Sequence, residues 1–117
     1  MNSDTIIDQV TFEALVDAVG EDFIDELLQA YFEEMPQLLA TLQHALENLD
    51  CDSFQRAAHS IKSTSNSFGA FQYGELAKEL ELLGKAKDLD SARGKVDKLT
   101  QEYQNVQHSL KVLNHGK

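Results

Sequence analysis

Apolar residues recur along the first half of the chain at intervals that alternate between four and three positions. The stripe consists of Ile24, Leu28, Tyr31, Met35, Leu38, Leu42, Ala45 and Leu49. Positions three and four apart share one face of an α-helix, so the pattern predicts one amphipathic helix from about residue 21 to residue 49. Pro36 lies within it, and we expect a bend there because proline removes one backbone hydrogen bond.

The same spacing returns in later segments and in a short one near the N-terminus. It predicts further helices at about residues 11–18, 53–68, 71–85 and 91–113. No segment alternates with the period of two that is typical of strands, and the connections are short, which favours antiparallel neighbours. We therefore expect an all-α fold, an antiparallel up-down four-helix bundle with a short additional N-terminal helix, as a single domain over residues 1–117.

Charge is distributed unevenly over the chain. Residues 1–50 contain twelve acidic and no basic side chains, a net charge of −12, whereas residues 51–117 contain eight acidic and ten basic side chains, a net charge of +2. An acidic surface repels phosphate groups, so we expect neither a nucleic acid nor a membrane as a partner. A protein partner that approaches the second half meets a weaker negative field.

Cysteine content and the N-terminal residues indicate a location. Cys51 is the single cysteine, so neither an intramolecular disulfide nor a cysteine-based zinc site can form. The chain begins without the basic and apolar segments of a signal peptide, and no apolar run approaches the roughly 18 residues that a membrane span needs. We expect a cytoplasmic protein. The four histidines are too scattered for a metal-binding pair, so we expect no metal site.

The segment RAAHSIKSTSNSFGA, residues 56–70, places a histidine among small and polar residues. At about 100° per residue, Phe54, Ala58 and Ile61 gather on the face that must meet the core, and His59 falls well away from it. The residues on its side of the helix are Gln55, Lys62, Ser63 and Asn66. We expect His59 to be exposed within a polar patch.

An exposed imidazole can attack phosphorus, because it is partly neutral near pH 7 and its ring nitrogen is unhindered. Lys62, one turn further on, can neutralise charge on a phosphoryl group bound to His59, and Arg56 can reach the rim. The residues alone also allow a plainer interpretation, in which this is a solvated surface. Gln55 has an alternative role as well, since it can close a capping box with Asp52.

The stretch AHSIKSTSNSFGA resembles the signature of histidine-containing phosphotransfer (Hpt) domains of bacterial two-component phosphorelays. In that family an exposed histidine on the second helix of a four-helix bundle is followed three residues later by lysine, and a glycine-alanine pair closes the helix. Here these positions are His59, Lys62, Gly69 and Ala70. The resemblance extends over nearly the whole chain. It departs from the family at Ser63, where glycine is usual, and we expect function to survive because serine is also small.

The resemblance implies that His59 accepts a phosphoryl group from the aspartate of one receiver domain and passes it to another. The chain would be a monomeric phosphocarrier without kinase activity or a cofactor of its own, and Mg²⁺ would belong to the receiver. The implied partners are response-regulator receiver domains and a hybrid sensor kinase. We expect the partner to contact the surface around His59, at Gln55, Arg56, Ser63, Asn66, Gly69 and Lys78.

The alternative function is a non-catalytic helical adaptor that binds a receiver or another regulator through the same face. A relay requires the imidazole of His59, whereas an adaptor tolerates its replacement by glutamine. An enzyme with its own small-molecule substrate needs a concave pocket with convergent polar groups, for which a compact bundle of this size leaves little room.

Overall fold

A computed structural model describes residues 6–115 of the chain as five α-helices and one 3-10 helix. Their order is α1 (Gln9–Val19), α2 (Glu21–Glu47), α3 (Cys51–Ser67), α4 (Phe71–Lys85), the 3-10 helix η2 (Asp90–Ala92) and α5 (Arg93–His115). No strand occurs between residues 6 and 115, which confirms the all-α class. The two ends of the expected domain, residues 1–5 and 116–117, lie outside the described residues.

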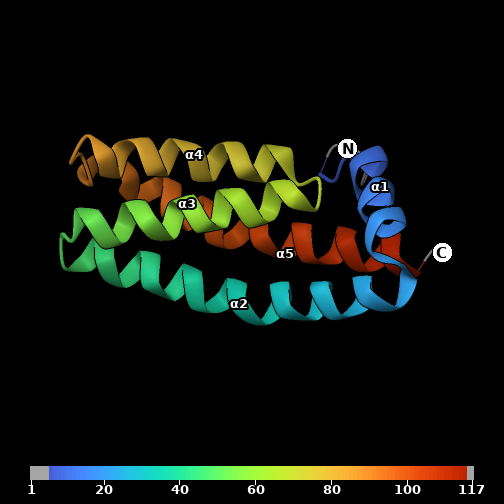
Figure 1. Cartoon of the computed structure of the whole chain (residues 1–117). Coiled ribbons are helices and arrows are strands. Elements are labelled where there is room, and N and C mark those ends of the chain that lie inside the picture. Colours follow the sequence, from blue (N-terminus) through green and yellow to red (C-terminus); the bar gives the residue numbers. More distant parts are fainter. Residues whose placement is uncertain (1–5, 116–117) are drawn as a thin grey trace.

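Helices α2 to α5 lie side by side along one long axis and run alternately up and down, while α1 packs across one end of the bundle (Figure 1). Helix α3 packs against both α2 and α4. The predicted antiparallel bundle with a short additional N-terminal helix is therefore confirmed. The chain ahead of α1 is attached to the bundle by a hydrogen bond of 2.8 Å from the backbone N of Asp8 to the carbonyl oxygen of Gly69.

Three of the helices end in the same way. The second residues after α2, α3 and α4 are Leu49, Gly69 and Lys87, and each has a positive φ, of 56°, 90° and 60° respectively. In each turn two successive N–H groups bond back to carbonyls of the last helical turn, which is the Schellman arrangement. This geometry reverses the chain within a few residues, so consecutive long helices become antiparallel neighbours.

The turn after α2 corrects one sequence prediction. Leu49 was expected in the helix and in the core, but α2 ends at Glu47 and the Leu49 side chain is 63% exposed. The reason is that Leu49 occupies the left-handed position of the turn, from which its side chain points to solvent. Asp50 then caps α3, accepting hydrogen bonds from the backbone N and the hydroxyl of Ser53 at 3.2 and 2.8 Å.

The buried face of α2 is wider than the predicted stripe. Leu39 and Leu46 are buried although the stripe omits them, and Leu38 is only half-buried. A regular spacing of three and four residues describes a narrow seam, whereas α2 packs against both α3 and α5 and buries a broader sector. Helix α2 continues through Pro36, whose exposed side chain lies on the outer face, and its ribbon is bowed in Figure 1.

A buried hydrogen bond and a group of aromatic rings join the helices where α3 ends and α4 begins. The hydroxyl groups of Tyr31 on α2 and Ser65 on α3 are 2.8 Å apart and buried. The ring of Tyr31 lies 4.9 Å from that of Phe68 and 6.1 Å from that of Tyr103, measured between centroids. Tyr73 donates a hydrogen bond of 2.9 Å to the carbonyl oxygen of Leu99. These contacts fix one face of α3 to the core and leave the opposite face for other roles.

Candidate functional site

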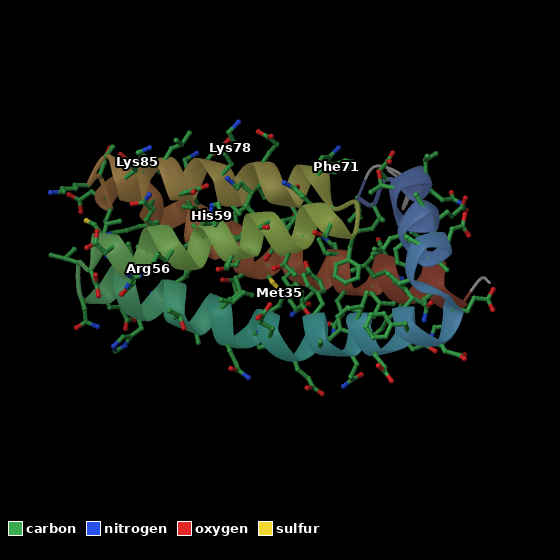
Figure 2. All side chains as sticks on the ribbon, in the orientation of Figure 1. Met35, Arg56, His59, Phe71, Lys78 and Lys85 are labelled. Carbon is green, nitrogen blue, oxygen red and sulfur yellow. The ribbon has the colours of Figure 1, made fainter. Side chains whose placement is uncertain are left out.

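His59 lies near the middle of α3, on the side that faces away from the core. Phe54, Ala58 and Ile61 of the same helix are fully buried, and the histidine side chain is 59% exposed. The predicted exposure of His59 is therefore confirmed. Figure 2 shows its ring on the open face of the bundle, between Arg56 on its own helix and Lys78 and Lys85 on α4.

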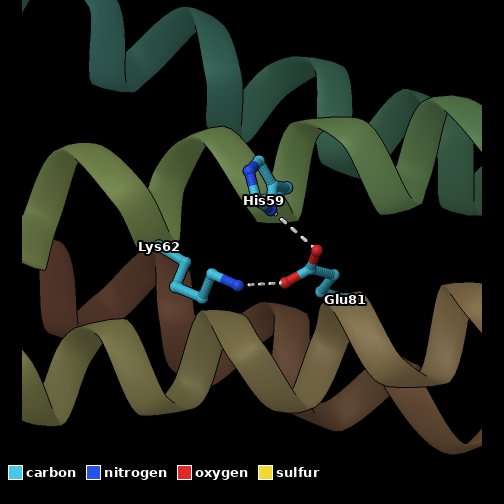
Figure 3. Close-up of polar contacts among 3 residues, drawn as sticks. All are labelled: His59, Lys62 and Glu81. Carbon is cyan, nitrogen blue, oxygen red and sulfur yellow. Dashed lines mark hydrogen bonds and ion pairs between the residues drawn. The ribbon is translucent and has the colours of Figure 1, made fainter.

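A carboxylate from α4 meets His59 and Lys62 together (Figure 3). Oε2 of Glu81 lies 2.8 Å from Nδ1 of His59, and Oε1 of Glu81 accepts a hydrogen bond of 2.7 Å from Nζ of Lys62. The Glu81 side chain is 17% exposed and that of Lys62 is 25% exposed. The three side chains thus form one linked group in which exposure increases from Glu81 to the histidine ring.

Glu81 is held as a carboxylate by its two neighbours. Partial burial raises the pKa of Glu81, but its hydrogen bonds and electrostatic interactions with Lys62 and His59 together lower it more, so the pKa lies below its ordinary value. An ionised carboxylate can only accept hydrogen bonds, so Nδ1 of His59 must carry the proton. In the neutral ring the proton is then on Nδ1 and the lone pair is on Nε2. Within the described residues, Nε2 has no hydrogen-bond partner.

Comparison with known proteins places this arrangement in a family. The model of the Hpt domain matches residues 26–109, which include His59, Lys62 and Glu81. The chain belongs to the Hpt domain family. Hpt proteins are phosphocarriers of two-component phosphorelays, in which they interact with receiver domains.

A solved structure supports the same fold. The histidine-containing phosphotransfer protein B (HptB) of Pseudomonas aeruginosa PAO1 is 24% identical in sequence, the match covers 96% of each chain, and the TM-score is 0.88. At this identity the likeness establishes the helical architecture of the Hpt domain and leaves the roles of single residues to be argued from the chain itself. A search of curated proteins found no significant match.

Sequence reasoning missed Glu81, although it found the two residues that Glu81 contacts. The carboxylate is 22 positions from His59 and belongs to another helix. Helix α4 does carry a signal, because Gly74, Ala77 and Gly84 are buried and share a face with Glu81. A single charged residue on a face of small buried residues must lie close to the neighbouring helix. The identity of its partners depends on the register between α3 and α4.

Several residues that were expected at the docking surface of this Hpt domain do surround the histidine. Gln55, Arg56, His59, Ser60 and Glu81 line a shallow depression of about 350 Å³ beside the ring. Ser63 and Lys78 are exposed. The capping box of Gln55 with Asp52 does not form, because α3 begins at Cys51 and Asp50 is its N-cap. Gln55 is therefore free to take part in this surface.

Two other expected docking residues are explained by the fold. Asn66 is half-buried and its amide lies against the Cα atom of Gly74 on α4, where an added Cβ would be 2.0 Å from Oδ1 of Asn66. Gly69 is buried in the turn after α3, and its carbonyl oxygen accepts the hydrogen bond from Asp8. A buried glycine offers no side chain to a partner. We therefore assign Gly69 to the fold rather than to the docking surface.

The described part of the chain contains neither a candidate metal site nor a candidate membrane-spanning helix. Residues 6–115 contain no group of three or more His, Cys, Asp or Glu side chains arranged to hold a metal ion. In the same range, no helix combines the length and the apolar character required to cross a membrane.

Proposed function

We propose that His59 is the phosphoryl acceptor of this Hpt domain and that Nε2 is the atom that carries the phosphoryl group. The observation that supports this most strongly is the contact between Nδ1 and the Glu81 carboxylate, since it leaves the lone pair on the exposed nitrogen. A nucleophile toward phosphorus needs both a free electron pair and access for in-line attack. His59 meets both requirements.

The proposed transfer step exchanges one bond to phosphorus for another. The lone pair of Nε2 attacks the phosphorus of a receiver phosphoaspartate, the bond from phosphorus to the aspartyl oxygen breaks, and the aspartate leaves as a carboxylate. The ring then carries a proton on Nδ1 and a phosphoryl group on Nε2, so it is cationic. The Glu81 carboxylate faces that cation through the 2.8 Å contact. Attack by the aspartate of a second receiver reverses these changes and frees His59.

Lys62 has a proposed role in charge balance. A phosphoryl group on Nε2 brings negative charge close to Glu81, which is itself negative. The ammonium group of Lys62, 2.7 Å from Oε1 of Glu81, offsets that carboxylate and adds positive charge beside the transferring group. We propose that Mg²⁺ and the acidic residues that bind it are supplied by the receiver, and that this chain contributes no cofactor.

The proposed docking surface consists of Gln55, Arg56, Ser63 and Lys78 around the histidine. These residues lie on α3 and α4, which together carry four acidic and four basic side chains and so have no net charge. The N-terminal half of the chain has a net charge of −12. Because a receiver presents an acidic site, the weaker field over α3 and α4 favours approach to the face that holds His59.

Transfer of label from a phosphorylated receiver domain in the presence of Mg²⁺ tests this proposal. We expect acid-labile, base-stable label on the wild type and on a His44→Gln control, which alters another exposed histidine, and none on His59→Gln. Label that persists on His59→Gln would overturn the assignment. If several receivers bind the wild type and His59→Gln equally and label neither, the chain is a non-catalytic adaptor.

A further inference from the structure

Helices α3 and α4 approach closely at two glycines of α4. A Cβ atom added to Gly84 would lie 3.0 Å from Cδ1 of Phe54 and 3.2 Å from the backbone N of Gln55. A Cβ atom added to Gly74 would lie 2.0 Å from Oδ1 of Asn66. Both glycines have helical backbone conformations and are buried, so neither is required for an unusual φ. Their common feature is the absence of a side chain where α3 is nearest.

The two contacts lie on either side of the candidate site. On α4 the residues that face α3 are Gly74, Ala77, Glu81 and Gly84, and on α3 the residues that face α4 are Gln55, His59, Lys62 and Asn66. The helices are antiparallel, so Gly84 meets Gln55 at one end and Gly74 meets Asn66 at the other. Glu81 lies between them and reaches His59 and Lys62.

The separation of the helices controls whether Glu81 can reach the ring. Hydrogen bonds from N–H to oxygen usually have donor–acceptor distances of about 2.7–3.2 Å, and the observed distance between Nδ1 and Oε2 is 2.8 Å. The obstacle at Gly84 is partly the backbone of α3, which cannot rotate away as a side chain can. A side chain at position 84 must therefore shift the Phe54 ring and the backbone of α3 by a few tenths of an ångström at Gln55, which is only four residues from His59.

We propose that Gly84 is a positioning residue, which sets the separation of α3 and α4 at which Glu81 holds the proton on Nδ1 of His59. Ala77, which is fully buried between Gly84 and Gly74, continues the same close approach. Gly84 acts only through Glu81, because it offers no group to a partner or to the phosphoryl group. Only the expected effect on phosphoryl transfer rests on the proposed function, because the tautomer of the His59 ring can be measured without a receiver.

The test measures the tautomer of His59 by ¹⁵N NMR of the histidine-labelled full chain, with the His59 signals assigned by their loss in His59→Gln. The wild type should carry its proton on Nδ1. We expect Gly84→Ala to reduce the Nδ1-protonated fraction and the larger Gly84→Val to abolish it. Gly94→Ala and Gly94→Val are the matched controls and should keep the wild-type signals, because Gly94 has no atom within 4 Å of its added Cβ.

Gly74→Ala is a second control on the same face of α4. The three atoms nearest to its added Cβ all belong to the side chain of Asn66, which can rotate away, so the ring tautomer should stay that of the wild type. We also expect phosphoryl transfer to slow about tenfold in Gly84→Ala, since small misplacements at a reacting centre have large effects on rate.

The outcomes separate this proposal from the proposed function. A folded Gly84→Ala variant with an unchanged tautomer would overturn the positioning role, whatever happens to transfer. If Gly84→Val does not fold, the comparison of Gly84→Ala with Gly94→Ala still decides. A shifted tautomer in a protein whose His59 accepts no phosphoryl group would keep the positioning role and reject the function.

Discussion

At the scale of single residues, one carboxylate determines what the two nitrogens of His59 can do. Glu81 accepts from Nδ1, and its bond to Lys62 keeps it ionised, so the lone pair is assigned to the exposed Nε2. The histidine itself is in an open, polar setting that places few demands on the fold. A substitution at this site can therefore change phosphoryl transfer while the stability of the fold changes little.

Replacement of Lys62 tests that separation. In Lys62→Ala we expect phosphoryl transfer from a receiver to be about tenfold slower, because the charge that offsets Glu81 and the phosphoryl group is lost. The free energy of unfolding should fall by only about 1 kcal/mol, because Lys62 is partly exposed and Glu81 keeps its contact with His59. Rapid-quench labelling and urea unfolding measure the two quantities.

Lys98→Ala is the control for this substitution. Lys98 is exposed on α5, where it lines a groove together with residues of α4, such as Gln72 and Leu76, and it should affect neither quantity. A transfer rate in Lys62→Ala equal to that of the wild type would remove Lys62 from the site.

The sequence was informative about His59 and Lys62 because both belong to one helix, and a helical wheel assigns faces within a helix. It did not indicate Glu81, because a helical wheel carries no information about the register between two helices. It also grouped Asn66 and Gly69 with the docking surface, whereas Asn66 packs on Gly74 and Gly69 is buried in a turn. Proximity in sequence to a functional histidine does not distinguish these roles.

At the scale of elements, the sequence predicted the helices, the bounds of α4 at residues 71–85 and the end of α3 at Gly69, but not the turns that begin at Leu49 and Lys87. Gly69 marks the end of α3, as a glycine in a left-handed turn commonly does. Leu49 and Lys87 occupy the equivalent positions after α2 and α4, although such residues rarely adopt a positive φ. The turns there are defined by backbone hydrogen bonds to the last helical turn. Such bonds do not depend on residue type, so the sequence does not indicate them.

The contact between α2 and α3 depends on a buried hydrogen bond that substitution can test. Ser65→Ala leaves the Tyr31 hydroxyl buried without its partner, so we expect the free energy of unfolding to fall by about 2 kcal/mol. Adding Tyr31→Phe removes the unpaired group and should restore most of that loss. Urea unfolding monitored by circular dichroism gives both values.

Ser63→Ala is the matched control, two residues earlier on the exposed side of α3. It should change stability by no more than about 0.5 kcal/mol. Equal losses in Ser65→Ala and Ser63→Ala would mean that the Tyr31 hydroxyl is not a structural contact.

At the scale of the whole molecule, all three tyrosines of the chain lie where the long helices meet. Burial raises the pKa of each of them above the ordinary value of 10.0, and it raises that of Tyr103 to about 12. The hydrogen bond with Ser65 offsets only part of this increase at Tyr31. The folded state therefore retains these phenolic protons at a pH where the unfolded chain releases them.

Alkaline titration should show the consequence for the fold. Because the folded pKa values exceed the unfolded ones, the tyrosines' contribution to stability is fully present below about pH 10 and is lost as pH rises toward 12. We expect tyrosinate absorbance to rise together with the loss of helical circular dichroism. A rise in tyrosinate absorbance near pH 10 with helical content unchanged would show that the rings are accessible in the folded state.

The central claim is that the exposed Nε2 of His59 carries the phosphoryl group while Nδ1 stays bonded to Glu81. The most direct measurement is ³¹P and ¹⁵N NMR of the histidine-labelled chain. The chain is phosphorylated by a receiver domain, and a small phosphodonor keeps that receiver phosphorylated. The account predicts one phosphoryl group, coupled to Nε2 of His59, and a proton on Nδ1. Phosphorus on Nδ1, or on His44, His108 or His115, would contradict it.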